Sequence, residues 1–116
     1  FPLPMTQTKN YDLSFSGLKT YARNLTEKTW GGKPNKQEIY DFTASVQYAV
    51  FRHICYKLSK ILQKYPNIKN VWLGGGVAAN ITLRKMVRAQ HDKLLTPYSK
   101  KLCGDNAAMI GIVATL

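Results

Sequence analysis

The sequence predicts a mixed α/β fold with short strands and several helices. A long amphipathic pattern fills residues 36–65, and two short apolar runs, 71–73 and 94–96, each precede a turn and a further helical pattern. Amphipathic periods of 3.6 residues that alternate with short apolar runs indicate helices packed against strands. We therefore expect the order helix, helix, strand, helix, strand, helix.

The first part of the chain is expected to be an extended segment followed by a short helix. Pro2 and Pro4 disfavour helix over residues 1–13, so this segment should cross a surface. Ser14 or Ser16 is then expected to cap a helix that runs to about Lys28. The apolar side of that helix carries Leu18, Tyr21, Ala22 and Leu25.

The long helix has the strongest signals in the sequence. Asn35 and Glu38 have the spacing of a capping box, and Pro66 ends the pattern after about 30 residues. The predicted apolar face consists of Ile39, Phe42, Val46, Val50, Ile54, Leu58, Ile61 or Leu62, and Tyr65. This helix should be the backbone of the domain.

The second half of the chain is predicted to hold two strands and two helices. Residues 71–73 are bounded by Asn70 and three glycines, which suits a buried strand, and a helix is expected from Ala78 to about His91. Its polar side carries Arg84, Lys85 and Arg88. A second strand over 94–96 ends before Pro97, and Asp105 is expected to cap the last helix.

Composition favours a polyanionic partner. The chain has 17 basic and 6 acidic residues, a net charge of +11, and its hydrophobic fraction of 45% argues against disorder. Nucleic acid is therefore the favoured class of partner, with a merely solvated basic surface as the alternative.

The remaining composition excludes several classes. Cys55 and Cys103 form no CxxC pattern, so neither a disulfide scaffold nor a zinc site is expected. No apolar stretch is long enough to span a membrane, and residues 1–10 do not resemble a signal peptide. His53 and His91 have no HExxH or HxxxH spacing, and no serine has a GxSxG setting, so neither metalloprotease nor hydrolase chemistry is indicated.

The segment GGGVAAN, residues 74–80, places three glycines between a strand and a helix. Glycine allows a sharp turn and close approach of the backbone to a ligand, and helix-terminal amides favour an anion. Asn80 offers both a donor and an acceptor to a ribose or a phosphate. A tight turn with an ordinary asparagine cap explains the same residues equally well.

The segment CGDNAAMIG, residues 103–111, again joins a turn to a helix of small residues. Asp105 at that helix start has the chemistry to cap the helix, to bind a metal, or to reach a phosphate through a cation, and capping is the favoured interpretation. If the two strands are parallel neighbours, Asn80 and Asp105 lie at the same edge of the sheet and share one cleft.

Five segments in this order resemble a known family: FPLPM, YDLSFSGLKT, DFTASVQ, GGGVAANITLR and CGDNAAMIG. Together they cover nearly the whole chain and are similar to the universal tRNA threonylcarbamoyladenosine synthesis proteins, once described as sialoglycoprotein endopeptidases. The resemblance implies a fold of the actin, sugar kinase and heat-shock chaperone superfamily, with two ribonuclease H-like lobes. Residues 1–116 would then be a single fragment of the C-terminal lobe, with the N-terminal lobe absent.

The resemblance also implies an activity and a site. The family transfers a threonylcarbamoyl group from threonylcarbamoyl-adenylate to the adenosine beside the anticodon of tRNAs that read codons beginning with A. It implies iron or zinc held by Asp105 and by an HxxxH pair in the other lobe, and an adenylate contact at Asn80 with Gly75 and Gly76. Partner subunits of the synthesis complex, and a cytoplasmic or organellar location, are implied as well.

Departures from the family pattern limit these expectations. The HxxxH segment is absent, and the chain starts without Met and ends inside an apolar run, so we expect a piece of a longer protein that is inactive alone. Gly104 stands where many relatives have Thr, which leaves the Asp105 carboxylate in place. The alternatives are a non-catalytic basic lobe that binds tRNA or partner subunits, and a sugar-kinase-like ATPase lobe.

Overall fold

The computed structural model describes residues 1–8, 10–31 and 33–115. Its four α-helices, two short strands and two 3-10 turns follow the predicted order. The chain divides into two compact units, Phe1–Tyr65 and Pro66–Leu116. The mixed α/β class is therefore confirmed for the described residues.

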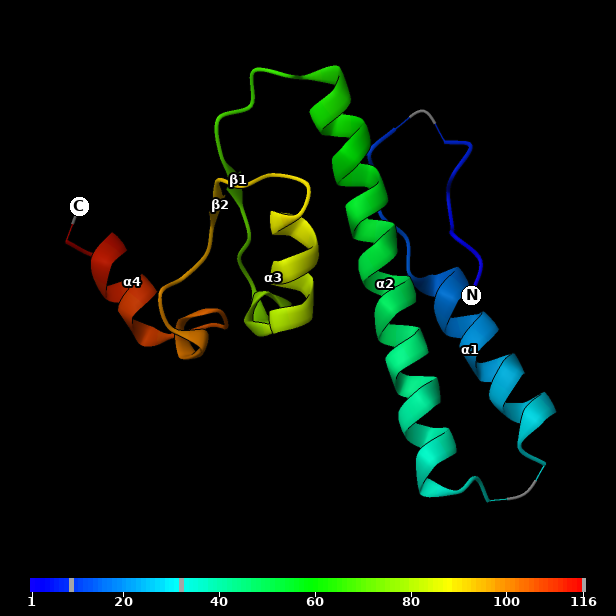
Figure 1. The fold of residues 1–116 in the computed structure, drawn as a ribbon. Helices are drawn as coiled ribbons and strands as arrows, with labels where there is room; N and C mark the ends of the chain where they lie inside the picture. Colours follow the sequence, from blue (N-terminus) through cyan, green and yellow to red (C-terminus); the bar gives the residue numbers. More distant parts are fainter. Residues whose placement is uncertain (9, 32, 116) are drawn as a thin grey trace. The chain divides into compact units, whose positions relative to one another are not determined.

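The first unit is built on two helices, α1 (Ser16–Thr29) and α2 (Lys36–Lys64). They lie side by side and run in opposite directions (Figure 1). Aromatic rings pack where they meet: the Trp30 and Phe42 ring centroids are 5.0 Å apart, and those of Phe1 and Phe42 are 5.9 Å apart. Leu18 is the buried residue of α1, as its place on the predicted apolar face requires.

The capping box of α2 is confirmed. Asn35 Oδ1 accepts a hydrogen bond from the Glu38 amide at 2.9 Å, and the Glu38 carboxylate accepts one from the Asn35 amide at 2.7 Å. Tyr65 forms the other end, one residue before Pro66. Both ends of the 29-residue helix therefore lie where the sequence predicts them.

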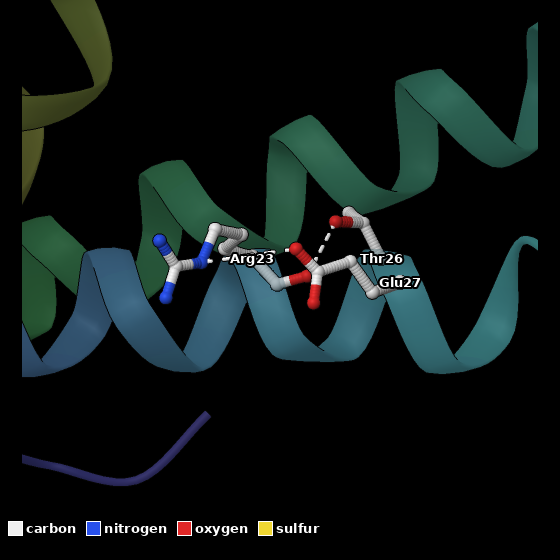
Figure 2. A network of polar contacts seen from close by, with 3 residues as sticks. All are labelled: Arg23, Thr26 and Glu27. Atoms are coloured by element: carbon white, nitrogen blue, oxygen red, sulfur yellow. Dashed lines mark hydrogen bonds and ion pairs between the residues drawn. The ribbon is translucent and has the colours of Figure 1, made fainter.

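The predicted cap of α1 is wrong. Phe15 occupies the N-cap position, and it makes no side-chain capping bond. The Ser14 and Ser16 hydroxyls lie 3.0 Å apart, on either side of the N-cap position, and hydrogen-bond to each other. Farther along α1, the solvent-exposed ion pair of Arg23 with Glu27 is 3.8 Å long (Figure 2). Because the basic residue comes first, this pair has the less favourable order for a helix.

The N-terminal strap, our name for the described residues of 1–14, has neither helix nor strand, as predicted, but it turns at residues 4–7 and is not extended throughout. Polar side chains of α2 hold it. Arg52 donates to the Phe1 carbonyl at 2.9 Å, and Tyr56 donates to the Thr6 carbonyl at 3.1 Å. Lys57 Nζ, on a side chain only 2% exposed, donates to Thr8 Oγ1 at 2.7 Å. The strap therefore covers a polar side of α2.

Burial along α2 differs from the predicted apolar face, and the strap accounts for the buried His53 and Lys57, which it contacts. The buried residues are Ala49, Phe51, His53, Cys55 and Lys57, whereas Val46, Val50, Ile54 and Leu58 are only half-buried. The spacing of apolar residues identifies the hydrophobic side of a helix. It does not identify a polar side that another segment of the chain covers. The side beneath the strap was thus missed.

The second unit contains a two-stranded sheet of β1 (Val71–Trp72) and β2 (Leu94–Leu95). The strands are parallel, with Val71 opposite Leu94 and Trp72 opposite Leu95. The helix α3 (Ile81–Arg88) lies between them in sequence and packs on β2. The core of the unit consists of Ala78, Leu83, Val87, Leu94 and Cys103.

Two details of this unit correct the predictions. The Trp72 side chain is 80% exposed, so β1 is not the fully buried strand we expected; two strands alone leave part of their surface uncovered. The helix expected from Ala78 begins at Ile81, because a 3-10 turn, η1 (Gly76–Ala79), comes first. A second 3-10 turn, η2 (Lys100–Leu102), precedes the last helix, α4 (Ala107–Val113).

Candidate functional site

The glycine-rich turn that follows β1 has an unusual backbone conformation. Gly75 has φ of +84°, a conformation that side-chain-bearing residues rarely adopt, so glycine is required there. At Gly74 and Gly76 a Cβ atom would meet no heavy atom within 4 Å. The space over the turn is therefore open, as a ligand that approaches the backbone would need.

Asn80 caps helix α3. Its Oδ1 accepts hydrogen bonds from the Thr82 amide at 2.9 Å and the Leu83 amide at 3.3 Å. Of the two interpretations of this residue, the structural one is thus confirmed. A contact from Asn80 to a nucleotide stays a prediction.

Asp105 does not cap helix α4, contrary to our expectation. Asn106 takes the N-cap position, and its Oδ1 accepts a hydrogen bond from the Met109 amide at 3.2 Å. The Asn106 Nδ2 group also donates to the Gly104 carbonyl at 3.1 Å, which anchors the same side chain from the other side. Within the described ranges, the exposed Asp105 carboxylate makes no hydrogen bond or ion pair, so it is uncommitted.

The two motif segments lie at the same edge of the sheet. Parallel strands point their carboxyl ends the same way, and η1 packs against η2. Arg84 of α3 connects the segments directly: its Nε donates to the Ala78 carbonyl at 2.6 Å, and its Nη2 donates to Cys103 Sγ at 3.2 Å. The prediction that the two loops neighbour each other is therefore confirmed.

Two open hollows lie along this edge. One, of about 410 Å³, is lined by Asp105, Asn106, Ala107, Met109 and Ile110. The other, of about 240 Å³, is lined by Trp72, Leu73, Gly74, Leu95, Thr96 and Pro97. Asn80 lines neither hollow, so a single cleft that holds both Asn80 and Asp105 stays a prediction.

The histidines and cysteines have structural surroundings. His53 is completely buried and its Nε2 accepts a hydrogen bond from the Ser14 amide at 3.4 Å, while the His91 Nε2 lies 3.1 Å from the Ile68 carbonyl. Burial, and secondly the charge of Lys57, lower the pKa of His53. Cys55 and Cys103 are free thiols, and burial raises the pKa of Cys55. The described part of the chain brings together no group of three or more metal-ligating side chains.

Arg84 was missed by the sequence reasoning, which placed it only on the polar side of a helix. Cys103 was likewise considered only as a disulfide or metal residue. Its role as an acceptor for Arg84 had no signature in the sequence.

A parallel β–α–β unit with a glycine-rich first turn defines an α/β protein of the class that binds ligands at the carboxyl edge of its strands. A sequence model of the TsaD family, described as tRNA N6-adenosine threonylcarbamoyltransferase, matches residues 1–112. The chain belongs to this family, as its five motifs predicted.

Individual relatives agree with this assignment. A tRNA N6-adenosine threonylcarbamoyltransferase of Limosilactobacillus reuteri (strain DSM 20016) is 42% identical over 120 residues, which are 96% of this chain and 33% of the relative. Proteins of the same name from Lactobacillus acidophilus and Wigglesworthia glossinidia brevipalpis are 40% and 37% identical, over 98% and 100% of this chain and 34% of each relative. The chain thus spans about a third of the length of these relatives.

Proposed function

We propose that this chain contributes part of the C-terminal lobe to a tRNA threonylcarbamoyltransferase of the actin and sugar kinase superfamily. The observation that carries the proposal is the pair of motif segments 74–80 and 103–111, which meet at one edge of the sheet in a chain of this family. The substrates are threonylcarbamoyl-adenylate and the adenosine beside the anticodon of tRNAs that read codons beginning with A. The protein works in the cytoplasm or in an organelle, with further subunits of the synthesis complex.

The adenylate lies over the glycine-rich turn in this proposal. Gly75 and Gly76 leave their backbone uncovered by any side chain of their own, and the open space above Gly74 and Gly76 supports a close approach. Asn80 lies at the positive end of the α3 dipole, which favours a nearby phosphate even though the Asn80 Oδ1 itself caps the Thr82 and Leu83 amides. These three residues therefore orient the adenylate.

Asp105 is one ligand of an iron or zinc ion in the complete site. Its chemistry fits, because carboxylate oxygens bind both metals, and its carboxylate is exposed and not committed to the cap of α4. The other protein ligands are histidines outside this chain. When bound, the metal supplies Lewis-acid polarisation of a carbonyl or phosphoryl oxygen.

The reaction is an acyl transfer. The exocyclic amine of the adenosine forms a C–N bond to the carbamoyl carbon and loses a proton, and the bond from that carbon to the adenylate phosphate oxygen breaks, so AMP leaves. The residues of this chain bind and orient the adenylate, which lowers the entropic part of the barrier. Without the second wall of the site, the 116-residue chain is inactive.

The experiment that tests this proposal measures transfer of labelled threonylcarbamoyl to tRNA by a longer protein that carries this segment. Asp105→Asn is expected to lower the rate at least about 100-fold, because it removes a metal ligand and not merely a supporting partner. Asp92→Asn is the matched control, since Asp92 is an exposed carboxylate of the same unit, and its rate should stay within about twofold. An unaltered rate in Asp105→Asn would contradict the role of that residue, and an absence of transfer in the unaltered protein would contradict the function.

A second candidate is a basic lobe that grips tRNA or a partner and does no chemistry. Lysines stand over tyrosine rings at the end of α2: Lys60 Nζ is 4.7 Å from the Tyr56 centroid, and Lys64 Nζ is 5.6 Å from that of Tyr11 and 5.3 Å from that of Tyr65. Hydrogen bonds with Tyr11 and Tyr65 raise the pKa of Lys64, which keeps it charged. Mixed basic and aromatic surfaces of this kind suit nucleic acid.

Filter binding of tRNA to the 116-residue chain over a salt series tests this second candidate. A steep fall in affinity with rising salt supports it, because phosphate contacts release counterions. No binding even at low salt would remove it.

A further inference from the structure

We infer that Arg84 is the positioning residue of this site: its guanidinium group holds the glycine-rich segment and the Asp105 segment in a fixed relation to each other. That these two segments form the functional site rests on the proposed function. That Arg84 connects them rests on its described contacts. It gives a role to a residue that touches neither the adenylate nor the metal.

The contacts of Arg84 reach both segments from one side chain. Nε donates to the carbonyl of Ala78, two residues before Asn80, and Nη2 donates to the thiol of Cys103, two residues before Asp105. Ala78 is 1% exposed and Cys103 is 4% exposed, whereas Arg84 is half-buried, so the acceptor side of each contact is shielded from water. Asn80 and Asp105 are therefore each two residues along the chain from a buried residue that is hydrogen-bonded to the Arg84 guanidinium group.

Arginine suits this role better than any other side chain. Its nitrogens diverge from a rigid plane, so one group can donate in two directions at once, whereas a lysine ammonium is a single point on a flexible stem. Hydrogen bonds from a charged donor in a shielded setting are also stronger than neutral ones. A lysine at this position would hold one segment and release the other.

Cys103 completes the connection on the second side. Its thiol donates to the Ser99 carbonyl at 3.8 Å while it accepts from Arg84 at 3.2 Å. The chain of bonds thus runs from the guanidinium through the sulfur to the backbone at the start of η2, and the sulfur acts as both acceptor and donor. A serine hydroxyl can do the same, and an alanine cannot.

The test uses NMR spectra and thiol alkylation of the 116-residue chain. The variants are Arg84→Met, Arg84→Lys, Cys103→Ala and Cys103→Ser, with Arg88→Met as the control because Arg88 is exposed one turn along the same helix. Circular dichroism checks that each variant keeps its helices. Alkylation of Cys103 is measured against buried Cys55 as the internal standard.

Three results are expected. In Arg84→Met, amide signals of residues 74–80 and 104–106 shift together. Alkylation of Cys103 becomes about tenfold faster, the change expected when one charge-assisted hydrogen bond no longer opposes local opening. Cys103→Ala disturbs amides of the glycine-rich segment across the connection, and Cys103→Ser restores them.

The inference is overturned if Arg84→Met shifts only signals within α3, or if Cys103→Ala leaves residues 74–80 unchanged. Arg84→Lys adds a second check, because it should restore the signals of one segment and not of both. These measurements need no enzymatic activity. An intact connection in a protein without transfer activity would overturn the proposed function alone, and an active protein with an unaffected Cys103 would overturn the role of Arg84 alone.

Discussion

His53 is a buried histidine whose neighbours favour the neutral ring. Its Nε2 accepts the Ser14 amide, Phe15 packs edge-on with ring centroids 5.6 Å apart, and Lys57 lies one helical turn away. The Nδ1 atom has no hydrogen-bond partner among the described residues. A proton added to Nε2 would break the bond to the strap and place a second cation beside Lys57.

The stability of the chain should therefore fall in mild acid. Burial, followed by the charge of Lys57, lowers the pKa of His53 below 6.5, so between that folded-state pKa and about 6.5 the unfolded chain binds more protons than the folded one. The stabilising contribution of the neutral His53 is therefore complete above about pH 6.5. As the pH falls below 6.5, the free energy of unfolding decreases by at most about 1.4 kcal/mol per pH unit.

Urea unfolding of the parent chain and of His53→Gln at pH 7.5 and 5.5 measures this effect. Glutamine keeps an oxygen to accept the Ser14 amide and does not titrate in this range. The parent should lose more stability than His53→Gln between the two pH values. Equal losses would contradict the account of His53, since His91 is present in both chains.

At the scale of elements, α2 is organised by its cap at one end and by the strap along its length. The capping box satisfies amides at the first turn, and Arg52, Tyr56 and Lys57 donate hydrogen bonds to the strap from two neighbouring turns. The first of these features was predictable, because a capping box has a local signature. The strap contacts were not, because they join residues about 50 positions apart and involve side chains that normally face solvent.

Asn35→Ala should destabilise the chain by about 1 kcal/mol, the usual effect of removing an N-cap side chain. Glu27→Ala is a useful comparison, because it removes one partner of the exposed pair in Figure 2 and should change the stability by less than about 0.5 kcal/mol. Urea midpoints of the two variants measure the difference. Equal effects would show that the box does not stabilise α2.

Lys57→Met should loosen the strap. The change keeps the length of the side chain and removes the donor to Thr8 Oγ1 and to the Asn10 carbonyl, which lies 3.0 Å from Nζ. Hydrogen exchange in peptides from residues 1–14 should become faster, with little change in residues 16–29. Lys36→Met serves as the control, because Lys36 is exposed and contacts only the Tyr40 ring among the described interactions. Unchanged exchange in the strap would contradict its dependence on Lys57.

At the scale of the whole molecule, the sequence predicted the order of elements and the neighbouring loops. Periodicity located α2, and short apolar runs located the parallel pair of β1 and β2, because both signals are local. The caps were harder to predict: Asp105 and Asn106 are adjacent and both suit an N-cap, and only their geometry decides between them. The role of Arg84 was not predicted, because its partners are a backbone carbonyl and a thiol, and neither gives a pattern of charged residues in the sequence.

No helix in the described part of the chain is long and apolar enough to cross a membrane.

The net charge of +11 is the property of the whole chain that bears most on its partner. It favours association with a polyanion such as tRNA at low ionic strength. The +11 charge is therefore consistent with both proposed functions and does not distinguish between them. The role of Asp105 does distinguish between them.

The central claim is that Asp105 is one ligand of a metal whose other ligands lie outside this chain. Isothermal titration with Zn²⁺ tests it in the 116-residue chain and in a longer protein that carries the segment. We expect no stoichiometric binding by the short chain, and one ion per longer chain that is lost in Asp105→Asn and kept in Asp92→Asn. Stoichiometric binding by the 116-residue chain, with loss in Asp105→Ala, would contradict the claim.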